Sequence, residues 1–288
     1  MKPAQFSYFR PRNAAEAVEL IAVAGEDARF LAGGQSLVPM MNFRIARPHA
    51  LVDLAACADL RFVRCEGGRL SIGAMVRQRD AERDDTIRRL SPLIGQALAH
   101  AGPVTIRNKA TVGGTIANGY PVAELPTVAL CLDAEIILLG PDGERRVAAK
   151  DFFIAGFVTA IETGELLREV IFPVCTPRTR YGFAECGNHA GGAALAIAAA
   201  SAEHAADGRL AHLSIAAAGL VSIPVRLPNV ETAVMEGRAR IADALAADID
   251  AVERSGKLVE ADAAQRHLVA VAVEDAAASL RAPMETAA

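Results

Sequence analysis

The sequence predicts a protein of mixed helices and strands, with an α+β or α/β unit up to about residue 176 and a smaller α+β unit after it. Three observations support this prediction. Short strand and helix patterns follow one another through the first unit and are separated by turn signals. Beyond a linker-like segment at 175–179, the composition shifts to alanine-rich stretches. The length of 288 residues also suits about two domains.

The first unit contains the patterns of two helices, several strands and two hairpins. Residues 14–25 form an amphipathic pattern that begins after Asn13, a good N-cap, and ends at Gly25. Residues 92–101 predict a second helix, with Pro92 in its first turn. Strands are expected at 28–31, 50–54, 62–65, 70–72, 135–139, 145–147 and 166–171, with hairpins over 62–72 and 135–147.

The second unit contains four further segments. Residues 193–202 and 213–219 are rich in small residues and flank the turn signal Asp207-Gly208-Arg209. The turn makes them a hairpin if both are strands, whereas the weak strand propensity of alanine favours a helix for the first. Helices are expected at 239–251 and 262–280.

The composition excludes several classes of protein. The chain has 30 basic and 34 acidic residues and a net charge of −4, so it lacks the basic character typical of nucleic-acid-binding proteins. A hydrophobic content of 52% indicates a large core rather than disorder. No apolar run reaches the roughly 20 residues of a membrane span. No secretory signal pattern follows Met1, and we therefore expect a cytoplasmic protein.

The cysteines and histidines do not form the pattern of a metal or cluster site. The five cysteines are odd in number and widely spaced, and no C-x-x-C motif occurs. This pattern disfavours disulfides, a zinc site and an iron–sulfur cluster. His49, His100 and His267 also lack the spacing of metal ligands. We therefore expect no metal in this chain.

A pair of glycines follows the expected strand at 28–31. The segment Ala32-Gly33-Gly34-Gln35-Ser36-Leu37 offers a flexible turn and then an amide and a hydroxyl side chain. Successive backbone N–H groups in such a turn can bind an anion. The segment lacks both the G-K-[ST] of a Walker loop and the G-x-G-x-x-G of a dinucleotide fingerprint. Taken alone, it is either a plain tight turn or a phosphate-binding loop.

A second glycine pair, Gly113-Gly114, lies further along the chain. Its polar and basic neighbours are Arg107, Lys109, Thr111, Thr115 and Asn118. Two glycine pairs with polar neighbours predict two loops that converge on one pyrophosphate. The two basic residues are either cations for this phosphate or solvated surface residues.

Three motifs together resemble one protein family. They are A-G-G-Q-S-L-V-P-M-M-N at 32–42, T-V-G-G-T-I-A-N at 111–118 and P-V-A-E-L-P at 121–126. This combination resembles the FAD-binding medium subunit of the molybdenum hydroxylases, which include carbon monoxide dehydrogenase flavoproteins and the flavin domains of xanthine dehydrogenase. The likeness covers nearly the whole chain, since similar runs occur at 51–54, 151–153 and 225–227.

The resemblance implies an α+β fold in which a two-subdomain FAD-binding unit of the vanillyl-alcohol oxidase type precedes a smaller α+β domain. On this basis, residues 1–176 form the FAD-binding domain, and the boundary between its subdomains lies near 55–60. Residues 177–288 form the C-terminal flavoprotein domain. FAD is expected to bind without a covalent link.

The resemblance also implies which residues hold FAD. The first loop is expected to wrap the pyrophosphate, and the second to contact it from the other subdomain. Ile161 and Phe183 fall where relatives place residues near the flavin ring. Ile161 is equally consistent with the core, and core packing is favoured for Phe183. The expected FAD-binding residues are Ala32, Gly33, Gly34, Gln35, Ser36, Leu37, Arg107, Thr111, Gly113, Gly114, Thr115, Asn118, Tyr120, Glu124, Ile161 and Phe183.

The resemblance implies an electron-transfer subunit of a heterotrimeric enzyme. In this family, a large subunit holds a molybdenum cofactor, and a small subunit holds two 2Fe–2S clusters that pass electrons to the FAD. The flavin then reduces an external acceptor, while the protein positions and tunes it. No catalytic base or nucleophile is therefore expected in this chain. The alternatives are a self-contained flavin-dependent oxidoreductase acting on a small molecule and a scaffold that has lost its flavin.

The chain departs from the family pattern at two places. Tyr120 stands where relatives often carry an acidic residue before a proline. Glu124 remains nearby and serves either the adenosine ribose or a structural hydrogen bond. In the second domain, Ala184-Glu185-Cys186-Gly187-Asn188-His189 replaces the basic pair and Gly-Asp of many relatives. Any flavin or subunit contact made by those cations is therefore lost or altered.

Overall fold

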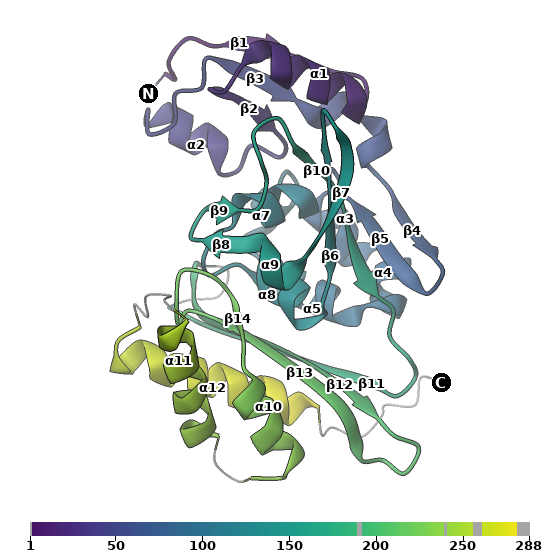
Figure 1. Cartoon of the computed structure of the whole chain (residues 1–288), viewed down its shortest axis with the longest axis vertical. Helices are drawn as coiled ribbons and strands as arrows, with labels where there is room; N and C mark the ends of the chain where they lie inside the picture. The colour runs from purple at the N-terminus through teal and green to yellow at the C-terminus, as the bar shows by residue number, and fades with distance from the viewer. Residues whose placement is uncertain (1, 189–191, 239–240, 256–260, 281–288) are drawn as a thin grey trace.

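The computed structural model describes residues 2–188, 192–238, 241–255 and 261–280. These residues form three tiers along the long axis, each built on its own β-sheet (Figure 1). The predicted mixture of helices and strands is therefore confirmed. None of the helices in the described ranges is long and apolar enough to cross a bilayer.

The N-terminal tier is a small parallel sheet covered by one helix. Its strands are β1 (Ser7–Phe9), β2 (Ala28–Leu31) and β3 (Ala50–Asp53), in the order β1-β3-β2. Helix α1 (Ala14–Ala24) begins where the sequence predicts, because the side chain of Asn13 accepts the N–H of Glu16 at 2.9 Å. The first glycine loop leaves β2 and leads into α2 (Leu37–Asn42).

The middle tier is a five-stranded sheet in the order β4-β5-β10-β6-β7. Both predicted hairpins are confirmed as antiparallel pairs, β4 with β5 and β6 with β7. The strands are β4 (Val63–Glu66), β5 (Arg69–Gly73), β6 (Glu135–Gly140), β7 (Gly143–Ala148) and β10 (Leu166–Pro173). Two 3₁₀ turns connect it to the first tier, η1 (Leu54–Ala56) and η2 (Ala58–Leu60).

Seven short helices and a small two-stranded sheet complete the middle tier. The sequence predicts only α5, because the other helices are four to eight residues long and too short to show a helical period. The helices are α3 (Gln78–Arg83), α4 (Asp85–Leu90), α5 (Pro92–His100), α6 (Val104–Arg107), α7 (Val112–Asn118), α8 (Glu124–Cys131) and α9 (Ala149–Phe152). The small sheet pairs β8 (Phe153–Ala155) with β9 (Val158–Thr159).

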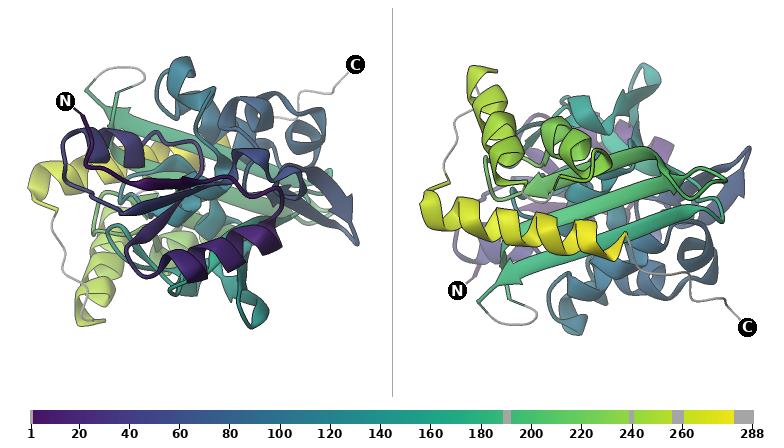
Figure 2. Two further views of the ribbon diagram at one scale, coloured as in Figure 1. Left: turned by 90° about the horizontal axis from the view of Figure 1, so that it is seen from above. Right: turned by 90° about the horizontal axis from the view of Figure 1, so that it is seen from below.

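The C-terminal tier is a four-stranded antiparallel sheet. Its strands are β11 (Thr179–Gly187), β12 (Ala194–His204), β13 (Leu210–Ala218) and β14 (Val225–Arg226), paired in chain order. Its helices are α10 (Pro228–Met235), α11 (Ala242–Arg254) and α12 (Ala263–Ser279). Figure 2 shows α12 lying across the outer face of this sheet. The predicted domain boundary at 176/177 falls between β10 and β11.

The alanine content of residues 193–202 favours a helix, and this prediction is wrong, because the segment forms strand β12. It pairs with β11 on one side and β13 on the other, so hydrogen bonds across the sheet satisfy its backbone. Its small side chains leave room for α12 and α8, which both pack against it. Tertiary packing therefore overrides the weak strand propensity of alanine. One hydrophobic core runs through this contact and includes Leu98, Leu125 and Ala199.

Candidate flavin-binding site

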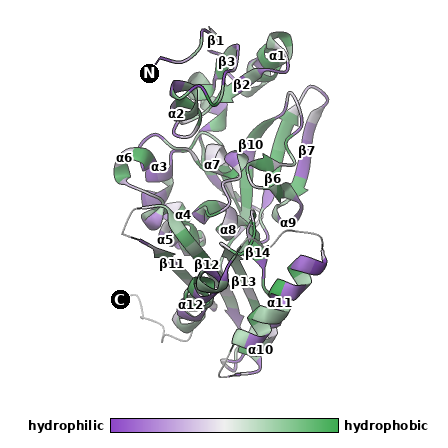
Figure 3. Cartoon of the chain, turned by 90° about the vertical axis from the view of Figure 1, so that its left-hand side faces the viewer, coloured by the Kyte–Doolittle hydropathy of each residue, from purple (hydrophilic) through white to green (hydrophobic). Residues whose placement is uncertain are grey.

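The two glycine loops lie directly against each other. A Cβ atom on Gly33 would lie 2.8 Å from the Cα of Ala110 and would also overlap the carbonyl oxygen of Lys109. A Cβ atom on Gly114 would lie 3.2 Å from the Cβ of Ala32. The side of the molecule that carries α2, α6 and α7 is shown in Figure 3. The glycines therefore permit contact between the loops, rather than only the approach of a ligand to the backbone.

The first loop presents a run of backbone donors without acceptors. Within the described part of the chain, the N–H groups of the five residues from Gly33 to Leu37 donate no hydrogen bond. Gly33 and Gly34 are half-buried, whereas Gln35 and Ser36 are exposed, so the donors lie near the surface. Successive free N–H groups of this kind can bind an anion such as a pyrophosphate.

Two features hold the first loop in this shape. Gly34 adopts φ +72°, a left-handed conformation that favours glycine. The side-chain amide of Gln35 donates to the carbonyl oxygen of Gly33 at 3.1 Å and so closes the turn on itself. Ser36 precedes α2, but its side chain makes no capping hydrogen bond. Its hydroxyl is therefore available to a ligand.

The second loop does not offer the free donors that its sequence suggests. Residues 112–118 form α7, and the N–H groups of its first turn already have acceptors within the protein. Val112 donates to Val76, Gly113 to Ala74, Gly114 to the Thr111 hydroxyl and Thr115 to the Thr111 carbonyl. The N–H groups of this first turn are therefore not free in this structure, and the expected contacts of the second loop with FAD stay predictions. Its role in this structure is to support the first loop.

A buried glutamine stabilises the second loop through hydrogen bonds. Gln78 is 4% exposed, and its side-chain amide donates to the hydroxyl of Thr115 at 2.8 Å. The Thr115 hydroxyl in turn donates to the carbonyl of Thr111 at 3.1 Å. The backbone N–H of Gln78 donates to Ala110, next to the contact with Gly33. Sequence reasoning missed Gln78, because a single glutamine carries no recognisable pattern.

The guanidinium group of Arg107 already has partners within the protein. Its Nε lies 3.0 Å from Oε2 of Glu82, and a second guanidinium nitrogen donates to the carbonyl of Gly102. Burial alone would raise the pKa of Glu82, but hydrogen bonds from Arg79 and Arg107 lower it overall. The side chain of Arg107 is only 11% exposed. Its predicted contact with the cofactor therefore competes with a formed ion pair.

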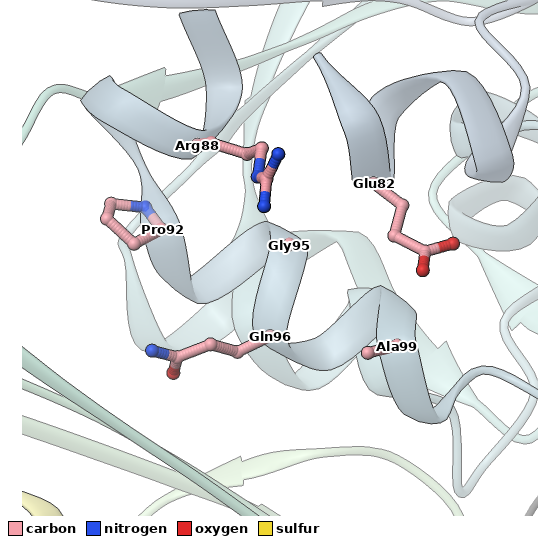
Figure 4. A pocket seen from close by; sticks show the side chains of 6 residues that line it. All are labelled: Glu82, Arg88, Pro92, Gly95, Gln96 and Ala99. Carbon is pink, nitrogen blue, oxygen red and sulfur yellow. The ribbon is translucent and has the colours of Figure 1, made fainter. Parts of the chain in front are cut away.

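A shallow pocket of about 370 Å³ lies on the surface formed by α3, α4 and α5. Figure 4 shows Arg88 and Glu82 on either side of it. Its lining residues are Glu82, Arg88, Pro92, Gly95, Gln96 and Ala99. None of them is an expected FAD-binding residue, so this pocket is separate from the glycine loops.

The residues after α7 lie near the β8–β9 hairpin. The ring of Tyr120 packs against Phe157, with centroids 5.7 Å apart, and is 38% exposed. The backbone N–H of Phe157 donates to Gly119 at 2.8 Å. Asn118 is half-buried at the end of α7, and Ile161 packs against the main core. Contacts of these residues with a flavin stay predictions.

Glu124 and Phe183 lie at the junction between the middle and C-terminal tiers. The ring of Phe183, on β11, lies 5.2 Å from that of His100 on α5. Burial raises the pKa of Glu124 to about 7, nearby Glu185 also raises it, and Arg107 opposes the change. Glu124 thus comes from a helix that packs against the C-terminal sheet, and Phe183 from a strand of that sheet. Their predicted roles toward FAD likewise stay predictions.

The fold and the loops define a class of protein. The N-terminal and middle tiers meet at the paired glycines, and the first loop offers backbone N–H donors that suit a pyrophosphate. No group of three potential metal ligands occurs among the described residues. These features fit a protein that binds a phosphate-containing organic cofactor. A family model described as the FAD binding domain in molybdopterin dehydrogenase matches residues 4–175. The chain belongs to this family, so FAD is its cofactor and it is an oxidoreductase component.

Similar curated proteins are named as subunits of dehydrogenases. The carbon monoxide dehydrogenase medium chain of Hydrogenophaga pseudoflava is 32% identical over 251 residues, which cover 87% of each chain. The medium chain of the same name from Afipia carboxidovorans is 43% identical over 184 residues, or 64% of this chain and 63% of that protein. Caffeine dehydrogenase subunit beta from Pseudomonas sp. strain CBB1 is 32% identical, with coverage of 80% and 78%.

Solved structures agree over the whole fold. A chain of carbon monoxide dehydrogenase from Hydrogenophaga pseudoflava superimposes with a TM-score of 0.88 at 30% identity, covering 97% of this chain and 98% of that one. A chain of quinoline 2-oxidoreductase from Pseudomonas putida 86 gives 0.85 at 28% identity, with coverage of 98% and 99%. The predicted fold, an FAD-binding unit followed by a smaller α+β domain, is therefore confirmed.

Proposed function

We propose that this chain is the FAD-carrying electron-transfer subunit of a heteromeric molybdenum hydroxylase. In the proposed enzyme, a large subunit carries the molybdenum cofactor, and a small subunit carries 2Fe–2S clusters that donate electrons to the FAD. The observation that carries the proposal is the run of five free N–H donors from Gly33 to Leu37, within the segment matched by the family model. A cytoplasmic location stays a prediction from the sequence.

The residues of this chain bind and orient the cofactor. FAD, when bound, supplies the redox chemistry that links the clusters to an external acceptor. The donors from Gly33 to Leu37 hold the negative charge of the pyrophosphate, and the Ser36 hydroxyl adds one hydrogen bond. The contact of Gly33 with Lys109 and Ala110 fixes this loop against the middle tier. No residue of the chain is assigned as an acid or base toward substrate.

This function is tested by comparing reduction of the flavin by substrate in the isolated chain and in the complex with the large and small subunits. The chain is purified alone and together with the large and small subunits, and the FAD absorbance is followed after carbon monoxide, an aldehyde or a nitrogen heterocycle is added. We expect the isolated chain to carry FAD and to stay oxidised with every substrate. Bleaching is expected only in the complex. Substrate-driven bleaching of the isolated chain would instead identify a self-contained oxidoreductase, and a colourless chain that takes up no FAD would indicate a scaffold.

A further inference from the structure

The two segments that carry the glycine loops are basic, although the chain as a whole is acidic. Neither 28–52 nor 103–123 contains an aspartate or a glutamate. Their basic residues are Arg29, Arg44, Arg47, Arg107 and Lys109. The net charge of the whole chain is −4, so positive charge is concentrated on the segments that meet at the first loop. Such a concentration of one sign attracts an anion.

Lys109 is in direct backbone contact with the first loop. A Cβ atom built on Gly33 would lie 2.8 Å from the carbonyl carbon of Lys109. Standard bond lengths then place the Cα atoms of these two residues within about 6 Å of each other. The flexible four-carbon stem of a lysine can therefore bring its ammonium group to a phosphate bound by the donors that begin at Gly33.

The charge of Lys109 is free to take this role. Lys109 is exposed, and among the described residues its ammonium group takes part in no ion pair or hydrogen bond. The guanidinium of Arg107 instead lies 3.0 Å from the carboxylate of Glu82 and is largely buried. The arginines of segment 28–52 donate to backbone carbonyls of the N-terminal tier, at distances from 2.8 to 3.3 Å.

One further cation lies beside the second loop. Arg77 is exposed, and its backbone forms a bridge with Thr111, the residue that caps α7. Its backbone contact is thus with the second loop, whereas that of Lys109 is with the donor loop itself. A comparison of the two residues therefore separates a specific contact from the general positive charge of this surface.

We propose that Lys109 is the cation that neutralises the pyrophosphate held by the first loop. The inference rests on the proposed function, because the pyrophosphate is that of FAD. The backbone donors carry only partial charges, whereas the ammonium adds a full positive charge and a charge-assisted hydrogen bond. Arg107 keeps its ion pair with Glu82, so the positive charge comes from the lysine two residues further along the chain. Since Lys109 is exposed, salt weakens its contribution.

The first test measures the dissociation constant of FAD for the full-length chain at low and high salt. The two solutions contain about 10 mM and about 1 M KCl, where charges are screened beyond about 30 Å and about 3 Å. Lys109→Gln should weaken binding roughly two- to fivefold at low salt, as expected for an exposed ion pair, and should have little effect at high salt. Lys109→Arg keeps the charge and should keep the salt dependence.

Two control variants remove a positive charge elsewhere. Lys150→Gln changes an exposed residue of α9 whose ammonium lies 3.6 Å from Asp151, and it should leave the affinity unchanged. Arg77→Gln should weaken binding less than Lys109→Gln does. Wild-type affinity of Lys109→Gln at low salt would overturn the proposal. An equal loss in Arg77→Gln would also overturn it, because the charge would then act without a specific contact.

The second test uses ADP, which carries a pyrophosphate but no flavin. Its binding to the flavin-free chain is followed by isothermal titration calorimetry at the same two salt concentrations. We expect ADP to bind the wild type more tightly than Lys109→Gln at low salt. A chain that binds ADP in this way but takes up no FAD would refute the proposed function and leave the role of Lys109 in place. FAD binding that does not depend on Lys109 would overturn the inference and leave the proposed function intact.

Discussion

The substitution Gly33→Ala tests whether contact between the two loops is what assembles the flavin site. The new Cβ would lie 2.8 Å from the Cα of Ala110 and would overlap the carbonyl oxygen of Lys109. Both are backbone atoms, so no side chain can rotate away, and the loops must separate by roughly 1 Å to reach ordinary contact distances of about 3.5–4.0 Å. Gly33 does not have a positive φ, so alanine adds no backbone strain of its own.

Overpacking of this kind costs about 1–3 kcal/mol. Because about 1.4 kcal/mol corresponds to a tenfold change in affinity, FAD should bind roughly 5- to 150-fold more weakly if the distortion is borne by the donor loop. The dissociation constant is measured by quenching of flavin fluorescence, and thermal unfolding is recorded in parallel. Gly95→Ala is a matched control on α5, because the nearest atom lies 3.9 Å from its Cβ. Wild-type affinity and stability in Gly33→Ala would refute the reasoning.

The remaining predictions concern a hydrogen bond to FAD, a buried carboxylate in the C-terminal tier and the helix that carries the second loop. Ser36→Ala should weaken FAD binding by no more than about tenfold, since one neutral hydrogen bond contributes about 0.5–1.5 kcal/mol; a larger loss in a fluorescence titration would show that Ser36 does more. Asp248→Ala should lower thermal stability by about 1–3 kcal/mol, because Asp248 is 2% exposed and accepts the N–H groups of Asn229 and Val230, both at 3.0 Å. FAD affinity should be unchanged in that variant, and a parallel loss of flavin would contradict the assignment. Gly113→Ala should destabilise the chain in thermal unfolding, because its Cβ would lie 2.6 Å from the Cα of Ala74, and an unaffected melting temperature would count against this packing.

Much of the fold follows from local signals in the sequence. Helix α1 begins and ends at its predicted cap residues, and the two hairpins of the middle sheet form across their glycine turns. Helix α7 was not predicted, because two adjacent glycines have low helix propensity. It forms because Thr111 caps it and because the carbonyls of Ala74 and Val76 accept its first N–H groups. These acceptors come from a distant part of the chain, which no local pattern reveals.

The sequence by itself determined the two glycine pairs, their polar neighbours and the family they resemble. Only the tertiary structure decided which loop has free backbone donors and which loop supports the other. Among the residues that the structure describes, the N–H groups of the five residues from Gly33 to Leu37 have no acceptor. The first turn of α7 instead donates within the protein, and the second loop supports the first through the contact of Gly33 with Ala110. The structure also placed the largely buried Glu185 of β11 beside His100 of α5. The physical reason is that hydrogen-bond satisfaction and desolvation depend on which distant groups meet in space, whereas turn and cap preferences depend only on neighbouring residues.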